Sequence, residues 1–597
     1  MTIVTIILLV LALILLTLTA LRPLFNFLHN IRLARSIKLP YYIFPVSEVN
    51  VLWLGLLETR SFQSLVKKWF PANLADYVYD SGFKFRWTVK DRLTRKYGGV
   101  YLIVTPGSVS CQVGDAEVIA QVCRQRQRFP KPSHQYEGME IYGSNVLTSE
   151  EKEWTRHRRY TQSSFNEKNN ALVWQESIRQ TIEMIAHWVD QYSSTKDPNS
   201  DLTIPGLQND ITKLTLNIFC GAGFGVHLPF KPYLGNTIEK ETVHDQFRDS
   251  ATPPPGYDFT FRSVAEYIGP NLTSIFLAVG ILPKWLSRIL RPFFKTPLKA
   301  YHNLGKYLRA LITMSQEEES NAHNLLAGLV RARREEQGNE GTKSKYGAGL
   351  SDQEILGNLF MFTIAGHETS STSLQFAFVL LAMHQDIQDW LYEGIREAVA
   401  DEPEDPAKWD YARVFPKLTT PLCVMLETLR LYPPVVTLPK WTSHSPAPIT
   451  HASITYTLPP NVPISLNANA LHYSPEYWGP DVTTFSPSRW DKRNTASFLA
   501  KNDGVEGLSV AGLDFETVHK PVRDAFIPFS DGSRACMGKK FAEVEFVAAL
   551  SVVFWRWRVR LAGDEGARER AEKALEESSA FLTLGMRDDL PLRFERR

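Results

Sequence analysis

The chain has 597 residues, 44% of them hydrophobic, and a formal net charge of +2 at pH 7. This length allows one large core or about two to four ordinary domains. A charge so close to zero argues against nucleic acid as the main partner. The five cysteines are scattered and form no Cys-x-x-Cys pair. They argue against a zinc knuckle or a disulfide framework, and they favour a reducing compartment.

The first 21 residues carry no charged side chain and are mostly Ile, Leu and Val. A helix of about 20 residues crosses a bilayer core, so we expect a transmembrane anchor over residues 1–21. A cleaved signal peptide is the alternative, but its usual basic start is missing. Residues 22–50 carry basic side chains and prolines and are expected to form a linker. The positive-inside tendency then places the body, residues 51–597, on the cytoplasmic side.

Two short runs after residue 99 are rich in Val, Ile and Tyr. Residues 100–104 and 108–113 are separated by Pro106-Gly107, which predicts a β-hairpin. A helix is expected from Asp115. We assign no structure to residues 51–96 from the sequence, and residues 494–523 are expected to be a surface insertion.

Further along the chain, Trp154 and Arg158 stand four residues apart. This spacing puts both side chains on one face of a helix. Taken alone, the segment is also consistent with a solvated basic helix. Residues 275–285 form an apolar run that ends in an aromatic residue. They fit either core packing or a shallow membrane contact.

A long helix is expected from Ser351, because Ser351 and Glu354 form a capping-box pattern. Few helix breakers follow until about residue 383, which gives a helix of about 45 Å. Polar Glu368 and Thr369 interrupt its apolar middle. A buried acid and hydroxyl cost several kcal/mol unless they are paired. Proton delivery is one use for such a pair, and a kink with a capped threonine is the alternative.

Two later patterns contain residues that can form an ion pair or bind a metal. Glu427 and Arg430 are i,i+3 neighbours that can form an ion pair. Cys536 stands between Gly532 and Gly538, directly before a helical run. A helix N-terminus stabilises a thiolate, and a sulfur exposed there can bind a metal from one side. A buried free cysteine is the commoner fate of a lone Cys.

The pattern Phe-x-x-Gly-x-Arg-x-Cys-x-Gly over residues 529–538 resembles the haem-binding loop of the cytochrome P450 family. Four further motifs occur in the family's order: the Trp154/Arg158 pair, residues 365–370, Glu427/Arg430 and residues 485–490. The resemblance implies that Cys536 is the axial thiolate and metal ligand. It also implies a structural network of Glu427, Arg430 and Arg489.

The resemblance further implies haem-contacting and proton-handling residues. The expected haem contacts are Cys536, Trp154, Arg158, Arg534, Phe529 and Lys440, and the expected catalytic residues are Thr369 and Glu368. Lys440 is the less certain contact, because a lysine lacks the bidentate fork of an arginine.

The implied fold is mainly α with a smaller β region: the cytochrome P450 fold, as one large catalytic domain behind an N-terminal transmembrane helix. The implied activity is that of a haem-thiolate monooxygenase with haem b as cofactor. It inserts one oxygen atom from O2 into a lipophilic small molecule, as in secondary metabolism. The chain has no glycine-rich dinucleotide fingerprint, so an NADPH–cytochrome P450 reductase is the expected electron donor. The expected location is the endoplasmic reticulum membrane.

Two other functions stay open at this point. A haem-thiolate isomerase or dehydratase would share the cysteine loop but use no external oxygen. A non-catalytic haem-binding membrane protein would bind haem without turnover. The presence of Glu368 and Thr369 favours the monooxygenase over both.

Overall fold

The computed structural model describes residues 21–47, 50–80, 86–193, 200–231, 246–247, 252–281, 289, 292–317, 324–337, 349–493, 495–496, 517–580 and 583–597. The expected anchor over residues 1–21 lies outside this part except for Leu21, and so does most of the expected insertion over residues 494–523. No helix in the described ranges combines the length and apolar character needed to span a membrane.

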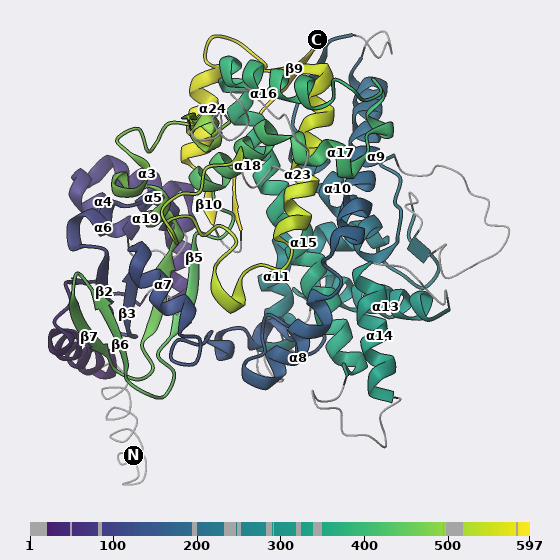
Figure 1. Cartoon of the computed structure of the whole chain (residues 1–597). Helices are drawn as coiled ribbons and strands as arrows, with labels where there is room; N and C mark the ends of the chain where they lie inside the picture. Colours follow the sequence, from purple (N-terminus) through teal and green to yellow (C-terminus); the bar gives the residue numbers. More distant parts are fainter. Residues whose placement is uncertain are drawn as a thin grey trace.

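A five-stranded mixed sheet forms one side of the molecule (Figure 1). Its strands, in spatial order, are β1 (Tyr41–Ile43), β2 (Val100–Val104), β3 (Val109–Val113), β8 (Pro463–Asn467) and β5 (Thr437–Trp441). The predicted hairpin is confirmed, since β2 and β3 pair antiparallel. Every residue of both strands is buried, which explains why they contain so many β-branched side chains. The helix expected from Asp115 is α7 (Ala116–Arg124), and Asp115 caps it.

The linker expected over residues 22–50 is wrong for its first part. Residues 21–37 are helical, and β1 adds to the sheet in parallel with β2. Ala34 is 0% exposed and Leu39 is 3% exposed in the core around this sheet. The prediction of a linker rested on the prolines and basic residues of this segment. The apolar residues between them instead find a sheet to pack against, and this long-range contact decides the local structure.

Within residues 51–96, to which the sequence assigned no structure, the described parts are mostly helical. It contains α2 (Val51–Glu58), α3 (Arg60–Trp69), α4 (Ala72–Asp80), α5 (Arg86–Val89) and α6 (Arg92–Tyr97). Smaller sheets lie elsewhere: β6 (Ala447–His451) with β7 (Ile454–Leu458), β10 (Ser579–Ala580) with β11 (Leu584–Gly585), and β4 (Leu202–Ile204) with β12 (Leu592–Arg596) and β9 (Trp557–Leu561).

The rest of the molecule is a helical body that shares one large hydrophobic core. Its longer helices are α8 (Glu151–Gln162), α9 (Glu167–Tyr192), α10 (Gln208–Phe219), α11 (Phe261–Phe276), α13 (Lys295–Glu317), α14 (Leu325–Gln337), α15 (Asp352–Met383), α16 (Gln385–Ala398), α18 (Thr419–Leu431), α23 (Lys539–Arg556) and α24 (Ala567–Glu576). Its short helices include α17 (Tyr411–Val414), α19 (Ala468–His472) and α20 (Pro475–Trp478).

Helix α15 runs through the middle of this body (Figure 1). The predicted capping box is confirmed at its start. The Ser351 N–H donates to Glu354 Oε2 over 2.8 Å, and the Glu354 N–H donates to Ser351 Oγ over 3.4 Å. Residues on all sides of α15 are buried, so the helix is a core element whose polar residues have to be satisfied inside the protein.

A buried ionic network fastens α18 to the segment after α20. Glu427 and Arg430 are both fully buried and form a bidentate pair, with N–O distances of 2.9 and 2.8 Å. Arg489 Nε and Trp490 Nε1 also donate to the carboxylate of Glu427, over 3.0 and 2.9 Å. Arg430 in turn donates to the carbonyl oxygens of His472 and Val482. The predicted Glu427–Arg430–Arg489 network is therefore confirmed.

The substitution Glu427→Gln tests how much this network stabilises the fold. It leaves the Arg430 guanidinium buried without a counter-charge. We expect the free energy of unfolding to fall by about 3–5 kcal/mol, measured by urea denaturation.

The matched control is Glu393→Gln, because Glu393 and Arg396 have the same i,i+3 spacing but are 53% and 59% exposed. This control is expected to cost less than about 1 kcal/mol. Equal losses in the free energy of unfolding of the two variants would show that the buried network stabilises the fold no more than an exposed ion pair does.

Candidate functional site

The cysteine loop is closed by one backbone hydrogen bond and one glycine. The Cys536 N–H donates to the carbonyl oxygen of Phe529 over 2.8 Å. Gly532 has a φ of +67°, and a Cβ there would lie 2.7 Å from the carbonyl oxygen of Cys123. Only glycine fits this position. The loop therefore presents Cys536 two residues before Gly538, which caps the N-terminus of α23.

Cys536 differs from the other cysteines in its surroundings. It is exposed, whereas the other four are buried. Burial nevertheless raises the pKa of its thiol, although the Gly538 N–H, Arg158 and Lys539 lower it. An exposed sulfur with this environment faces a space inside the protein. The helix N-terminus alone does not keep it ionised, so a metal that displaces the proton would complete the site.

Several cations gather beside this loop around the indole of Trp154. The guanidinium carbons of Arg126 and Arg534 each lie 4.3 Å from the ring centroid, and that of Arg158 lies 5.7 Å away. Arg534 also forms an ion pair with Glu150 over 2.6 Å. The predicted haem contacts Trp154, Arg158 and Arg534 are therefore brought together by the fold.

Two lysines add to this cation cluster. Burial, followed by Arg534 and Lys440, lowers the pKa of Lys131 well below its usual value. The pKa of Lys440, which is 5% exposed in β5, is also lowered by burial. We use the name cation cluster for Arg126, Lys131, Arg158, Lys440 and Arg534. Its members oppose one another's protonation, so the cluster favours an anionic partner.

The cluster also contains donors that no residue of the described structure satisfies. Arg126 Nη1, Arg534 Nε and, next to Lys440, Trp441 Nε1 are buried without a hydrogen-bond partner in the described structure. A buried donor without an acceptor costs about 1–3 kcal/mol. The propionates of haem supply negative charge and acceptors together. The residues present therefore fit haem, with Cys536 as the sulfur ligand.

Arg158 and Phe529 make contacts that the sequence did not specify. Arg158 Nη1 donates to the carbonyl oxygen of Ala535 over 2.9 Å, so its guanidinium supports the loop that carries Cys536. Phe529 is half-buried against the helical core, and its carbonyl oxygen holds the Cys536 N–H. Neither arrangement tests the predicted haem contacts of these two residues.

The middle of α15 carries the other predicted part of the site. Ala365 is exposed and Gly366 is partly exposed, although the preceding residues from 355 to 364 are buried. An exposed residue in the middle of a core helix indicates an internal space beside it. A Cβ on Gly366 would lie 2.4 Å from the Phe219 ring, so this glycine also allows α10 to pack closely.

Aromatic contacts connect α15 to the helix that follows the cysteine loop. A Cβ at Gly538 would lie 3.8 Å from Phe165, whose ring centroid is 6.1 Å from that of Phe362 on α15. Phe219 lies 5.8 Å from Phe541 on α23, measured between ring centroids. Aromatic side chains thus link the start of α23, which follows the loop, to α15.

The two predicted catalytic side chains lie one turn along α15. Thr369 Oγ1 donates to the carbonyl oxygen of Ala365 over 3.1 Å. Burial raises the pKa of Glu368, although a hydrogen bond from Thr583 lowers it. Its Oε2 atom is buried and has no hydrogen-bond partner in the described structure. Glu368 therefore holds a proton more readily than an ordinary glutamate does.

Three residues of the site were missed from the sequence. Arg126 and Lys131 come from the loop after α7, and Thr583 comes from the C-terminal hairpin region. The basic run Arg124-x-Arg126-x-Arg128 was a usable signal. No local pattern indicated that Thr583 contacts Glu368, because this contact spans over 200 residues of sequence.

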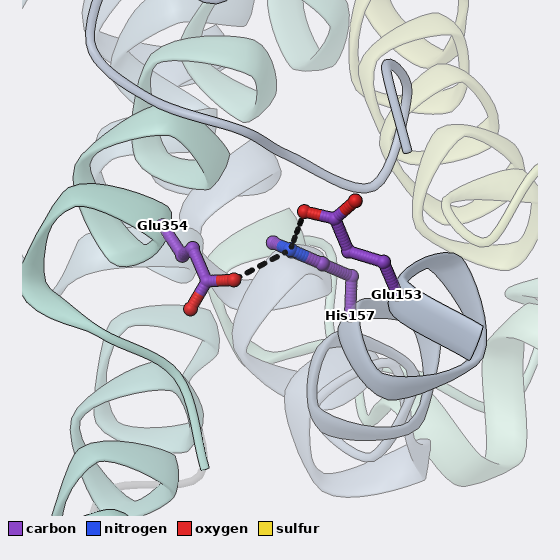
Figure 2. A group of neighbouring side chains, drawn as sticks. All are labelled: Glu153, His157 and Glu354. Atoms are coloured by element: carbon purple, nitrogen blue, oxygen red, sulfur yellow. Dashed lines mark ion pairs between the residues drawn. The ribbon is translucent and has the colours of Figure 1, made fainter. Parts of the chain in front are cut away.

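A second cluster resembles a metal site, but the hydrogen bonding of its histidine argues against metal binding. Ligand atoms of Glu153, His157 and Glu354 lie within 4.8 Å of one another, and Figure 2 shows the imidazole between the two carboxylates. Asn358 Oδ1 accepts the Val146 N–H, so its Nδ2 donates to His157 Nδ1 over 2.8 Å. The proton of a neutral imidazole is then on Nε2, which faces Glu354 over 3.4 Å. The cluster therefore links α8 to α15 by hydrogen bonds and offers no imidazole lone pair to a metal.

An acid pair in the cysteine loop predicts a pH dependence. Burial and the nearby Asp531 raise the pKa of Asp524 to about 6. The folded protein keeps this proton up to about pH 6, whereas the unfolded chain releases it near about pH 4. Stability should therefore fall as pH rises through this window.

We expect Asp524→Asn to flatten the decrease in thermal midpoint between pH 4 and 6. Parallel profiles for the variant and the native protein would contradict this assignment.

Comparisons with known proteins show the family to which the chain belongs. The family model for Cytochrome P450 matches residues 78–583. A cytochrome P450 monooxygenase of Postia placenta is 32% identical over 511 residues, covering 83% of this chain and 84% of the relative. One of Arthrobotrys oligospora is 29% identical over 595 residues, covering 96% and 95%. The crystal structure of a cytochrome P450 heme domain shares the fold, with a TM-score of 0.61, 19% identity, and coverage of 85% of this chain and 92% of that one. The chain therefore belongs to the cytochrome P450 family of haem b monooxygenases.

Proposed function

We propose that this monooxygenase inserts one oxygen atom from O2 into a lipophilic small molecule, with electrons from an NADPH-dependent reductase. One observation carries the proposal: Cys536 is exposed beside a cluster of cations with unsatisfied donors, which is an environment that fits a carboxylate-bearing haem. Haem bound there would supply the activation of oxygen and its transfer to a C–H bond. The protein supplies ligation, charge balance, a dry pocket and protons.

The residues of the site would divide this work. Cys536 would hold the iron through its sulfur. Arg126, Trp154, Arg158 and Arg534 would hold the carboxylates of the cofactor, since the three guanidinium groups gather around the indole and those of Arg126 and Arg534 each keep an unsatisfied donor. Glu368 would keep a proton inside the protein because burial raises its pKa. Thr369 would turn its hydroxyl from the Ala365 carbonyl oxygen towards the pocket and pass that proton on.

Two features support the proposed substrate class. Aromatic side chains such as Phe165, Phe219 and Phe362 pack between the helix that follows Cys536 and α15, and aromatic surroundings suit an apolar molecule. One relative is described as a phomenoic acid biosynthesis cluster cytochrome P450 monooxygenase of Leptosphaeria maculans, with 25% identity over 595 residues. We therefore place this enzyme in secondary metabolism, acting on a terpenoid, steroid, polyketide or alkaloid intermediate.

The cellular location belongs to the same proposal. Residues 1–21 are uncharged and apolar, and Arg22, Arg32 and Arg35 follow them. This arrangement suits a single span of the endoplasmic reticulum membrane with the catalytic domain on the cytoplasmic side. A membrane position would also bring the enzyme close to a membrane-bound NADPH–cytochrome P450 reductase and to lipophilic substrates.

Feeding a metabolite library to membranes that contain this protein, reductase and NADPH tests the activity. We expect at least one product heavier by one oxygen atom, with the added oxygen derived from labelled O2. Cys536→Ser is expected to abolish both the product and the red-shifted carbon-monoxide band of a thiolate-ligated haem. A rearranged or dehydrated product of unchanged oxygen source would favour an isomerase or dehydratase. The carbon-monoxide band without any turnover would favour a haem sensor.

The roles of Thr369 and Glu368 can be separated from general effects on folding. Thr369→Ala and Glu368→Gln are each expected to lower the product formed per NADPH by about 10- to 100-fold, since each removes a group that handles protons. The carbon-monoxide band should persist in both variants.

Thr363→Ala is the matched control. Thr363 also donates from its hydroxyl to the carbonyl oxygen four residues earlier, but it is buried one and a half turns away on α15. Its product yield per NADPH should match that of the native protein. Native yield in Thr369→Ala and Glu368→Gln as well would rule out the proposed proton delivery.

A further inference from the structure

A cavity that contains none of the residues assigned to the haem site lies on another part of the molecule. Its volume is about 390 Å³, and it lies between α5 and α6 on one side and the segment after α19 on the other (Figure 1). This size is in the range of small-molecule sites. The lining combines apolar side chains with cations, namely Pro475, Pro480, Val482, Lys90, Arg92 and Arg95.

The aromatic rings and the backbone around this cavity are fixed by the core. Trp87 Nε1 and the Tyr473 hydroxyl both donate to the carbonyl oxygen of Leu431, over 3.4 and 2.8 Å. The carbonyl oxygen of Val482 accepts a hydrogen bond from Arg430 over 2.7 Å, within the buried ionic network. The cavity is therefore formed before any ligand arrives, and a ligand would bind without having to order its walls.

Two of the three cations in the lining are paired with acids. Arg92 forms ion pairs with Asp76 and Asp80. Arg95 forms one with Asp91 over 3.0 Å. The positive charges of these two guanidinium groups are therefore balanced by the protein itself.

Lys90 is the cation of this lining that forms no ion pair within the described part of the chain. Its side chain is partly buried, and its ammonium lies 4.6 Å from the ring centroid of Tyr473 and 5.3 Å from that of Trp87. Burial lowers the pKa of Lys90, although Glu576 and Asp91 raise it. Aromatic rings compensate a cation only in part. The cavity therefore contains one positive charge without a direct counter-charge.

The backbone of Lys90 is a second indication that its side chain has a use. Its φ is +49°, which is in the left-handed region where glycine is the ordinary residue. Its N–H donates to the carbonyl oxygen of Trp87 over 3.2 Å, directly after the end of α5. A lysine in this conformation costs stability, and such strained residues are typical of binding sites.

We propose that this cavity is a second ligand site, which binds a small organic monocarboxylate through the Lys90 ammonium and contacts its apolar body through the prolines and the valine of the lining. One uncompensated positive charge matches one carboxylate. A phosphate dianion would bring a second negative charge close to Asp91, with no further unpaired cation in the described lining to balance it. The inference does not depend on the proposed monooxygenase activity.

Titration of the holoenzyme with hexanoate, followed by calorimetry, tests this site. We expect hexanoate to bind, and Lys90→Met to weaken its affinity by about 10- to 100-fold, because the variant loses a charge-assisted contact. 1-Hexanol, which has the apolar body without the charge, and inorganic phosphate should both fail to bind at the same concentrations. The absorption spectrum of the haem should stay unchanged throughout the titration.

The matched control is Lys96→Met. Lys96 is exposed on α6 and lies 5.3 Å from the ring centroid of Tyr97, but it does not line the cavity. This variant should bind hexanoate with the affinity of the native protein. Lys90→Gly suits the positive φ, so it should fold and yet lose hexanoate binding.

Four results would overturn the proposal. The first is a native protein that does not bind hexanoate, and the second is one that binds phosphate or 1-hexanol equally well. The third is a haem spectrum that changes in parallel with binding, because hexanoate would then occupy the haem pocket. The fourth is a lower thermal midpoint in Lys90→Met together with native hexanoate affinity, which would show that Lys90 only stabilises the fold.

Discussion

Electrostatic repulsion within the cation cluster is the constraint on which the site depends. Burial lowers the pKa of Lys131, of Lys440 and of Arg534, and other members of the cluster lower it further. Glu150 offsets only part of this charge through its ion pair with Arg534. The protein therefore keeps an anion-binding site in its interior at a cost to its own stability. A ligand that binds only the folded state repays this cost through mass action, so folding and haem binding are coupled through these charges.

In the Glu427–Arg430 network, in contrast, the buried charges balance each other within the protein. Its two charges are fully buried, but the carboxylate of Glu427 accepts five hydrogen bonds from four residues and the guanidinium of Arg430 donates to backbone carbonyl oxygens. Nothing is left for a ligand to satisfy. The two clusters show how buried charge can be used either for holding segments together or for binding. The difference lies in whether the donors and acceptors are complete within the chain.

The parts of the fold that the sequence predicted correctly are set by local rules. The capping box at Ser351 and the hairpin around Pro106-Gly107 each depend on a few adjacent residues. The Glu427 network was predictable only because the family resemblance supplied its distant partner, Arg489. The helix over residues 21–37 and the contact between Thr583 and Glu368 were not predictable in this way. Both depend on surfaces formed by residues far away in the chain.

Helix α15 shows why one core element can serve both packing and chemistry. Its apolar residues are buried on all sides, so any polar group on it is desolvated and becomes a better proton holder. Gly366 lets the Phe219 ring of α10 pack against the helix, whereas Ala365 beside it is exposed. One turn later, burial raises the pKa of Glu368, and the Thr369 hydroxyl donates to the carbonyl oxygen of Ala365. The helix therefore carries a proton holder and a hydroxyl next to its exposed turn while the rest of its surface packs in the core, and a uniformly apolar helix could not do both.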